Sequence, residues 1–138
     1  MKTQISKNFT LEEFLYSLTA KQKGIDNTPT PEIIENIKKL VFNTIQPART
    51  LYDKPIRVSS GYRSPALNKA VGGSINSHHM EGKAADITTG SPAENKALFN
   101  VIIKSDILFD QLIDESYYSW LHISYNEGKN RKQILHLT

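Results

Sequence analysis

The segment Ser77–Thr88, SHHMEGKAADIT, runs from a loop with two adjacent histidines into a series of small residues that contains one carboxylate. Its second half, Ala84 to Thr88, has the alternation of a strand. In a strand, successive side chains point to opposite faces, so Ala85 and Ile87 share one face and Asp86 lies on the other. The segment therefore raises the possibility of a metal site built on a loop and the strand that follows it.

The composition limits the kind of protein and the kind of metal site. The chain has 138 residues, of which 38% are hydrophobic and 22% charged. This length and balance predict one globular domain that spans residues 1–138. The chain contains no cysteine, which excludes disulfides, thiolate zinc sites and thiol nucleophiles. Any metal must therefore be held by histidine and carboxylate.

Charge and hydropathy bear on partners and location. The net charge is +3, and the basic residues are scattered apart from KK at 38–39 and GKNRK at 128–132. A nucleic-acid-binding protein shows a denser basic stripe, so no nucleic-acid partner is expected. No run approaches the ~18 apolar residues of a membrane-spanning helix. The opening MKTQISKNFTLEEF lacks the apolar core of a secretory signal, so we expect synthesis in the cytoplasm.

Helices are predicted in the first half of the chain and once more after Ser91. Thr10 and Glu13 form a capping-box pattern that predicts a short helix. Apolar residues at three- and four-residue spacing predict a long amphipathic helix from Pro31, with a bend near Pro47. Ser91 and Glu94 form a second capping-box pattern that opens a helix to about Lys104. The residues that set the long helix are Ile33, Ile37, Leu40, Val41, Ile45 and Ala48.

Strands dominate the second half. Alternating patterns predict strands at 56–60, 84–88, 109–113, 120–125 and 132–137, and a short helix at SPALNKAV, 64–71. Helices gathered at the start and strands at the end predict an α+β fold, a small and mostly antiparallel sheet with the N-terminal helices packed on it.

A third possible ligand lies in the strand 120–125. There Leu121 and Ile123 share one side and His122 lies on the other. If the apolar sides of both strands face the core, Asp86 and His122 lie on the same open face, where His79 from the loop can join them. Two histidines and one carboxylate form a recognised catalytic zinc set, with a fourth position left for water or substrate.

Taken together, these motifs resemble the M15 family of zinc peptidases, the D-alanyl-D-alanine carboxypeptidase and endolysin group. The family pattern S-x-H, two residues, G-x-A-x-D matches Ser77 to Asp86, and W-x-H matches Trp120 and His122. SGYR matches residues 60–63, and NFTLEEFLYSLTAKQKGIDNTP, residues 8–29, resembles the opening of a phage- and prophage-associated branch. The resemblance covers nearly the whole chain and implies a Hedgehog/DD-peptidase-like fold.

The resemblance also implies roles for individual residues. His79, Asp86 and His122 would be the ligands of Zn²⁺, although cobalt or manganese can occupy similar sites. Arg63 would hold a carboxylate or carbonyl of the substrate peptide, a task that suits its planar, permanently charged guanidinium. Ser77 would donate or accept a hydrogen bond beside the substrate or the metal ligands. His78 matches no motif position and is expected to be exposed or to support the site, and His136, on the last predicted strand, is expected to be structural.

The general base is where the chain departs from the family pattern. Many members carry an acidic residue three positions before the last histidine, and that position is Ser119 here. The phage-like branch carries QLI-x-E, which corresponds to residues 111–115. We therefore predict Glu115 as the general base, with Asp114, whose side chain points the opposite way, as the second choice.

The predicted function is a zinc-dependent peptidase that acts on bacterial peptidoglycan. It would be either a D-Ala-D-Ala carboxypeptidase or an endopeptidase for stem or cross-link bonds. The alternative is a non-catalytic, zinc-containing cell-wall-binding module of the same fold, which gains weight if neither Glu115 nor Asp114 reaches the metal. We expect a monomer that is made without a signal peptide. This suits either a phage lysis enzyme that reaches the wall after release or a cytosolic recycling enzyme, and the resemblance of the N-terminal residues favours the phage or prophage setting.

Overall fold

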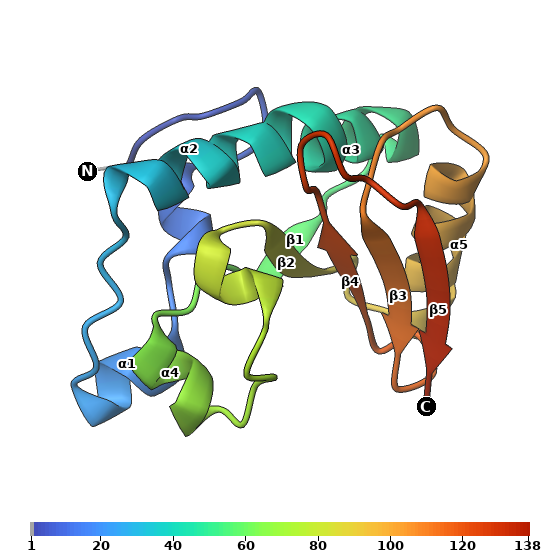
Figure 1. The fold of residues 1–138 in the computed structure, drawn as a ribbon. Helices are drawn as coiled ribbons and strands as arrows, with labels where there is room; N and C mark the ends of the chain where they lie inside the picture. The colour runs from blue at the N-terminus through green and yellow to red at the C-terminus, as the bar shows by residue number, and fades with distance from the viewer. Residues whose placement is uncertain (1) are drawn as a thin grey trace.

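Five short strands form a single sheet in the order β1-β2-β4-β3-β5 (Figure 1). The computed structural model describes residues 2–138 of the chain. The predicted α+β class is confirmed. In chain order the elements are the 3₁₀ helix η1 (Leu11–Phe14), α1 (Leu18–Lys23), α2 (Pro31–Leu40), the π-helical turn η2 (Val41–Ile45), α3 (Gln46–Tyr52), β1 (Arg57–Ser60), α4 (Pro65–Ala70), the 3₁₀ helix η3 (His78–Glu81), β2 (Ala84–Thr88), α5 (Pro92–Ile103), β3 (Gln111–Glu115), β4 (Trp120–Ser124) and β5 (Gln133–Leu137).

The sheet is mostly antiparallel, as predicted. β1 pairs with β2, β2 with β4 and β4 with β3 in antiparallel fashion, whereas β5 runs parallel to β3 at the edge. The predicted strand 109–113 is displaced by two residues, since the ladder between β3 and β4 continues to the pair Glu115–Trp120. In the centre of the sheet, Asp86 lies directly opposite His122. Adjacent strands therefore deliver these two side chains to one face.

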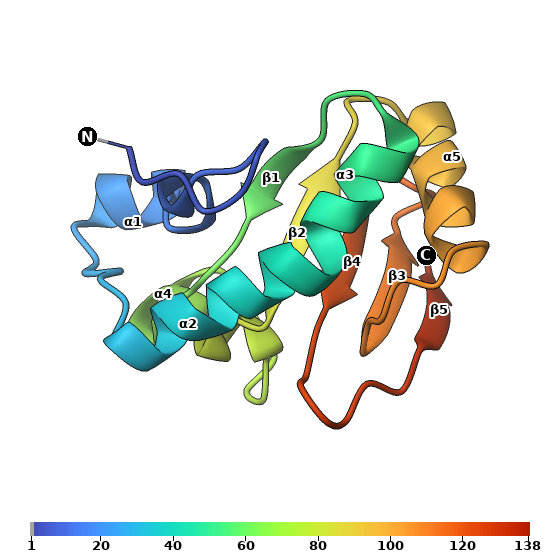
Figure 2. The ribbon, with the colours of Figure 1, turned by 90° about the horizontal axis from the view of Figure 1, so that it is seen from above.

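One face of the sheet is covered by helices. α2, η2 and α3 form a continuous rod that runs obliquely across the strands, and α5 lies beside β3 (Figure 2). Leu40, Val41 and Ile45 of the rod are fully buried in one cluster with Ile87 and Leu121 of the sheet. Burial of one such side chain stabilises the fold by about 1.5–3 kcal/mol. The apolar face thereby leaves the opposite face, with Asp86 and His122, free for a site.

At Pro47 the long helix continues, but the turn before Pro47 changes from α-helical to π-helical geometry. The ring of Pro47 removes the N–H that an α-helix needs at that position. The residues just before it, Val41–Ile45, form a π-helical turn in which the Gln46 N–H donates to the Val41 carbonyl, five residues back. Pro47 then occupies the first turn of α3.

The helix caps confirm one capping prediction and correct another. Ser91 caps α5 by accepting a hydrogen bond from the Glu94 N–H. The reciprocal half of the predicted capping box does not form, because the Glu94 carboxylate accepts from Tyr52 and Lys54 instead. The predicted capping box at Thr10 is wrong: Thr10 makes no side-chain cap, and the residues after it form a 3₁₀ helix. Thr10 is extended and pairs with Gln4 in an isolated β-bridge, and within residues 2–138 its buried hydroxyl has no hydrogen-bond partner.

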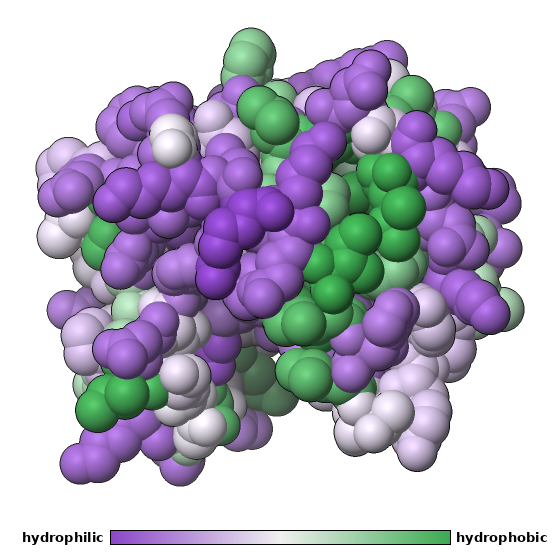
Figure 3. All heavy atoms as spheres, turned by 45° about the vertical axis from the view of Figure 1, so that its right-hand side comes forward, coloured by the Kyte–Doolittle hydropathy of each residue, from purple (hydrophilic) through white to green (hydrophobic). Residues whose placement is uncertain are grey.

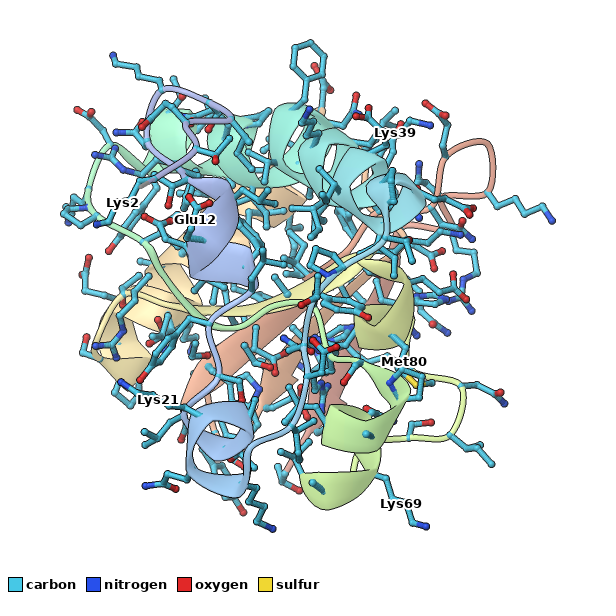
Figure 4. All side chains as sticks on the ribbon, turned by 90° about the vertical axis from the view of Figure 1, so that its left-hand side faces the viewer. Lys2, Glu12, Lys21, Lys39, Lys69 and Met80 are labelled. Carbon is cyan, nitrogen blue, oxygen red and sulfur yellow. The ribbon has the colours of Figure 1, made fainter. Side chains whose placement is uncertain are left out.

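Two further features concern the helices and the surface. No helix within residues 2–138 is long and apolar enough to cross a membrane. The labelled lysines Lys2, Lys21, Lys39 and Lys69 lie on different sides of the molecule in Figure 4. These four lysines are spread around the molecule and do not form one stripe.

Candidate metal centre

Three side chains converge on the open face of the sheet. His79 comes from η3, Asp86 from the middle of β2 and His122 from the middle of β4. His122 Nδ1 lies 3.2 Å and His79 Nε2 lies 3.4 Å from the same oxygen, Asp86 Oδ1. One ligand atom from each residue lies within 4.8 Å of the others. The alternation of apolar residues in two distant segments thus predicts the cluster that the fold assembles.

The spacing of these atoms fits a zinc ion. With Zn–N near 2.0–2.1 Å and Zn–O near 2.0–2.2 Å, tetrahedral geometry separates neighbouring ligand atoms by about 3.3–3.5 Å. The separations of 3.2 and 3.4 Å from Asp86 Oδ1 are close to that edge length. Two imidazole nitrogens and one carboxylate oxygen are also the donor types of known catalytic zinc sites. The donor set therefore fits Zn²⁺ with one position left over.

The backbone before β2 sets the orientation of His79. Its Nδ1 lies 2.8 Å from the carbonyl oxygen of Gly61, and its side chain is buried. That hydrogen bond makes Nδ1 the protonated nitrogen and leaves the lone pair of Nε2 for a metal. Ser77 Oγ accepts a hydrogen bond from the His79 N–H at 3.1 Å. Ser77 thus holds the backbone of a ligand residue.

Asp86 is set up to be an anion. Burial, the largest single influence, raises its pKa, but the hydrogen bonds and charges of His122 and His79 together outweigh burial and lower the pKa well below its usual range. A carboxylate that stays ionised is the form that binds a cation. The two imidazoles therefore prepare Asp86 for that role in advance.

The three donors open into a cleft of about 600 Å³. In Figure 3 the lower half of the molecule is divided by a hollow. The cleft is also lined by Arg63, Ser77, His78, Glu115, Trp120 and Arg131. All but one of the site residues predicted from the sequence are therefore brought together, and the one left out is Asp114.

Arg63 presents a guanidinium without a protein partner. It is half-buried, its Nε is buried without a hydrogen bond, and within residues 2–138 its side chain makes no ion pair. Burial lowers the pKa of Arg63 below its ordinary value, because it outweighs the opposite effect of the negative charges of Asp86 and Glu115. A half-buried guanidinium beside the three candidate metal ligands can donate hydrogen bonds to a bound molecule, and a carboxylate or carbonyl is the best acceptor for it.

Asn27, which the sequence reasoning missed, holds the backbone on both sides of Arg63. Its Nδ2 donates to the carbonyls of Leu15 and Tyr62, each at 3.0 Å, and its Oδ1 accepts from the Ser64 N–H at 2.7 Å. On the inner side, the Arg63 N–H donates to the His79 carbonyl at 3.0 Å. The loop that carries Arg63 is thus tied to the N-terminal segment and to the ligand loop. No sequence signal links Asn27 to a residue 36 positions away.

Glu115 lies at the end of β3 with its side chain in the cleft. The indole Nε1–H of Trp120, its partner in the ladder, donates to Glu115 Oε2 at 3.2 Å. Within residues 2–138 no other hydrogen bond reaches this carboxylate, so Oε1 is free to accept a proton. Ser119 lies in the turn between β3 and β4, where its hydroxyl donates to the Ser116 carbonyl.

Asp114 lies on the other face of the sheet. It is buried, and its carboxylate contacts His136 Nδ1 of β5, on the face away from His122. The His136 ring also packs against Phe99 of α5. Burial and the neighbouring Asp114 raise the pKa of Tyr118 on the same side. Asp114 and His136 thus form a polar contact between β3 and β5, and the structure does not bring Asp114 to the site.

Comparisons with known proteins agree with this geometry. Residues 7–124 match the family model described as Peptidase M15. A curated relative, the zinc D-Ala-D-Ala carboxypeptidase of Streptomyces albus G, is 56% identical over 39 residues. The matched part covers 28% of this chain and only 15% of that relative.

Proposed function

Because the chain belongs to the peptidase M15 family, we propose that it is a zinc metallopeptidase that hydrolyses peptide bonds of bacterial peptidoglycan. The observation that carries the proposal is the convergence of His79 Nε2, Asp86 Oδ1 and His122 Nδ1 beside a cleft. When bound by these three atoms, zinc would supply a Lewis acid that polarises a substrate carbonyl and makes water more acidic.

The remaining cleft residues have separate tasks. Arg63, whose guanidinium meets no protein partner among residues 2–138, binds a carboxylate or carbonyl of the peptide and orients the scissile bond. Glu115 takes a proton from the attacking water and later passes it to the nitrogen of the leaving amine. Trp120 holds one oxygen of Glu115, which fixes the direction in which the other accepts. Asp114 has no part in this scheme, because it lies on the opposite face.

The bond that is cut is either a terminal D-Ala-D-Ala bond or an internal stem or cross-link bond. The D-Ala-D-Ala carboxypeptidase of Streptomyces supports the first of these, but its matched segment covers only a small part of that enzyme. Incubation of zinc-loaded protein with purified peptidoglycan separates them. Free D-alanine marks a carboxypeptidase, whereas new amino groups without D-alanine mark an endopeptidase.

The matched controls are His122→Ala, which removes a metal ligand, and Glu115→Gln, which removes the base and leaves the metal ligands in place. We expect Glu115→Gln to bind zinc normally and to lose activity by roughly 10²–10⁴-fold. Full activity in Glu115→Gln would contradict the choice of base. Absence of any product with wild-type protein, together with retention on insoluble peptidoglycan, would instead support the non-catalytic wall-binding module.

We further propose that the protein acts on the cell wall after release from the cytoplasm in a phage or prophage setting. Support comes from the resemblance of residues 8–29 to the phage-associated branch. Expression in bacteria with and without a holin-type pore tests this, since lysis is expected only with the pore. The substrate partner is a peptide, and a monomer is expected in sedimentation.

A further inference from the structure

The cleft contains a second arginine that the scheme above does not use. Arg131 belongs to the loop between β4 and β5 and lines the same cleft as Arg63 and the metal-binding residues. Among the lysines and arginines of residues 2–138, these two arginines line that cleft. A peptide that occupies the cleft therefore meets two guanidinium groups.

Arg131 is held in one orientation by Asp110. Its Nε donates to Asp110 Oδ1 at 2.8 Å, its Nη2 donates to Oδ2 at 3.0 Å, and its backbone N–H also reaches Oδ1 at 3.1 Å. Asp110 is only 1% exposed, so its position is fixed by the surrounding core. The neighbouring backbone is anchored too, because Lys132 N–H donates to the Phe109 carbonyl. Arg131 is thus a preorganised group and not a mobile surface side chain.

The pairing with Asp110 leaves much of the guanidinium free. A guanidinium carries five N–H donors, and the side-on contact to Asp110 uses the one on Nε and one on Nη2. Within residues 2–138 no protein acceptor takes the other three, and the Arg131 side chain is 54% exposed. The free edge, Nη1 with the second Nη2 hydrogen, can form a bidentate pair with another carboxylate. Asp110 fixes the plane of that edge, much as a carboxylate orients a ligand histidine.

We propose that Arg131 forms an anion subsite that binds a second carboxylate of the substrate, separate from the group that Arg63 holds. This inference rests on the proposed peptidase function and narrows its substrate class to acidic peptides with a free carboxylate outside the scissile bond. The competing explanation is that the Arg131–Asp110 pair serves only to fasten the β4–β5 loop.

The test is a comparison of two peptides that differ only in that carboxylate, which is free in one and a carboxamide in the other. Wild-type protein should cleave the carboxylate peptide with a kcat/KM about 10-fold higher, in line with a charge-assisted hydrogen bond at a partly exposed site. Arg131→Gln should reduce this ratio to about one. The change should fall mainly on KM, because the subsite binds ground state and transition state alike.

Three further variants separate the subsite from other effects. Lys129→Gln removes a positive charge from the same loop at an exposed residue outside the cleft, and should keep the wild-type ratio. Arg131→Lys keeps the charge but loses the fork, and should give an intermediate ratio. If Arg131→Gln unfolds because buried Asp110 loses its partner, the double variant Asp110→Asn with Arg131→Gln removes that buried charge and gives the ratio instead.

A wild-type preference that survives in Arg131→Gln, or that is absent in wild type, overturns the subsite while leaving the peptidase intact. If wild-type protein cleaves neither peptide, the proposed function fails, and calorimetric binding of the same two peptides tests the subsite alone. Tighter binding of the carboxylate peptide that is lost in Arg131→Gln supports it, and equal binding of both peptides refutes it.

Discussion

At Gly61 a backbone carbonyl, rather than a side chain, sets the direction of a metal ligand. The carbonyl accepts the Nδ1 hydrogen of His79, while the α-carbon lies against the chain at Phe14. A Cβ added at Gly61 would be 2.4 Å from the Phe14 carbonyl oxygen. Glycine is therefore required for packing, and the packing in turn fixes a hydrogen bond of the metal centre.

Gly61→Ala should accordingly damage stability and metal binding together. The methyl group forces apart two backbone segments, which costs about 1–3 kcal/mol or more, and it shifts the carbonyl that orients His79. We expect a lower melting temperature and a zinc affinity reduced by about 10–100-fold, as for other lost partners of ligand histidines. Gly128→Ala is the control: its φ of +79° strains an added side chain, but a Cβ there would meet nothing within 4 Å, so it should lower stability without changing zinc affinity. Unchanged zinc affinity in folded Gly61→Ala would refute the link.

The residues that the sequence reasoning found and missed differ in a physical way. His79, Asp86 and His122 are reactive side chains at positions where an alternating apolar pattern fixes the face. No sequence pattern indicates a role for Asn27 or for the Gly61 carbonyl, since an amide and a backbone oxygen gain their roles only from tertiary contacts. The Arg131–Asp110 pair, 21 residues apart, is likewise set by how two loops pack.

At the scale of elements, the loop between β1 and α4 is held from two directions. Asn27 binds its outer side at Tyr62 and Ser64, and η3 binds its inner side at Arg63. Substrate binding by Arg63 and metal binding by His79 therefore share one piece of backbone.

Asn27→Asp tests that arrangement with almost no change of shape. The carboxylate can still accept from Ser64 but no longer donates to the carbonyls of Leu15 and Tyr62, so unsatisfied acceptors cost about 1–3 kcal/mol. We expect a raised KM through displacement of Arg63, with zinc affinity changed less. Asn43→Asp, where the amide reaches only the Lys39 carbonyl of its own helix, is the matched control. A drop in stability with KM unchanged would leave Asn27 a purely structural residue.

The Arg131–Asp110 pair, which fastens the loop between β4 and β5, should make the free energy of unfolding depend on pH. The hydrogen bond from Arg131, the largest influence, lowers the pKa of Asp110 despite burial. A carboxyl whose pKa is lower in the folded state stabilises the protein above its unfolded pKa of about 3.9, and this contribution is lost as the pH falls through the folded pKa. The free-energy difference of unfolding between wild type and Asp110→Asn should therefore be large at pH 7 and shrink by pH 3. Denaturant titrations at both pH values measure it, and a constant difference would contradict the assignment.

Elements were predictable where local pattern and tertiary packing agreed. Ser91 caps α5 as expected, because the cap depends on neighbours within three residues. The π-helical turn before Pro47 and the parallel pairing of β5 with β3 were not foreseen, since both depend on how distant segments meet. Thr10 does not cap although its backbone is extended, as a cap requires; within residues 2–138 its buried hydroxyl has no hydrogen-bond partner.

At the scale of the whole molecule, the metal centre joins parts that are far apart in sequence. His79, Asp86 and His122 come from the 3₁₀ helix η3 and two strands of the sheet, and they span 43 residues of chain. A ligand that binds only the folded state stabilises it by about 2.7 kcal/mol at 100 times its dissociation constant. For a domain of this size, that corresponds to roughly 5–10 °C in melting temperature.

Removal of zinc by a chelator should therefore lower the melting temperature by that amount, and re-addition of zinc should restore it. His122→Ala should melt at one temperature with or without chelator, because it lacks a ligand. Differential scanning calorimetry measures both, and an equal chelator effect on wild type and His122→Ala would place the stabilising metal elsewhere.

Because Asp86 is directly paired with His122 across β2 and β4, metal binding depends on the register of these two strands. A slip of one residue between these strands would turn one strand's side chains to the wrong surface and bring Leu121 or Ile123 where an imidazole belongs. Such a mispaired chain keeps too few donors to capture the cation. Only molecules in which β2 and β4 are paired in the native register would then bind zinc. The amount of zinc bound during refolding therefore measures the fraction of correctly paired molecules.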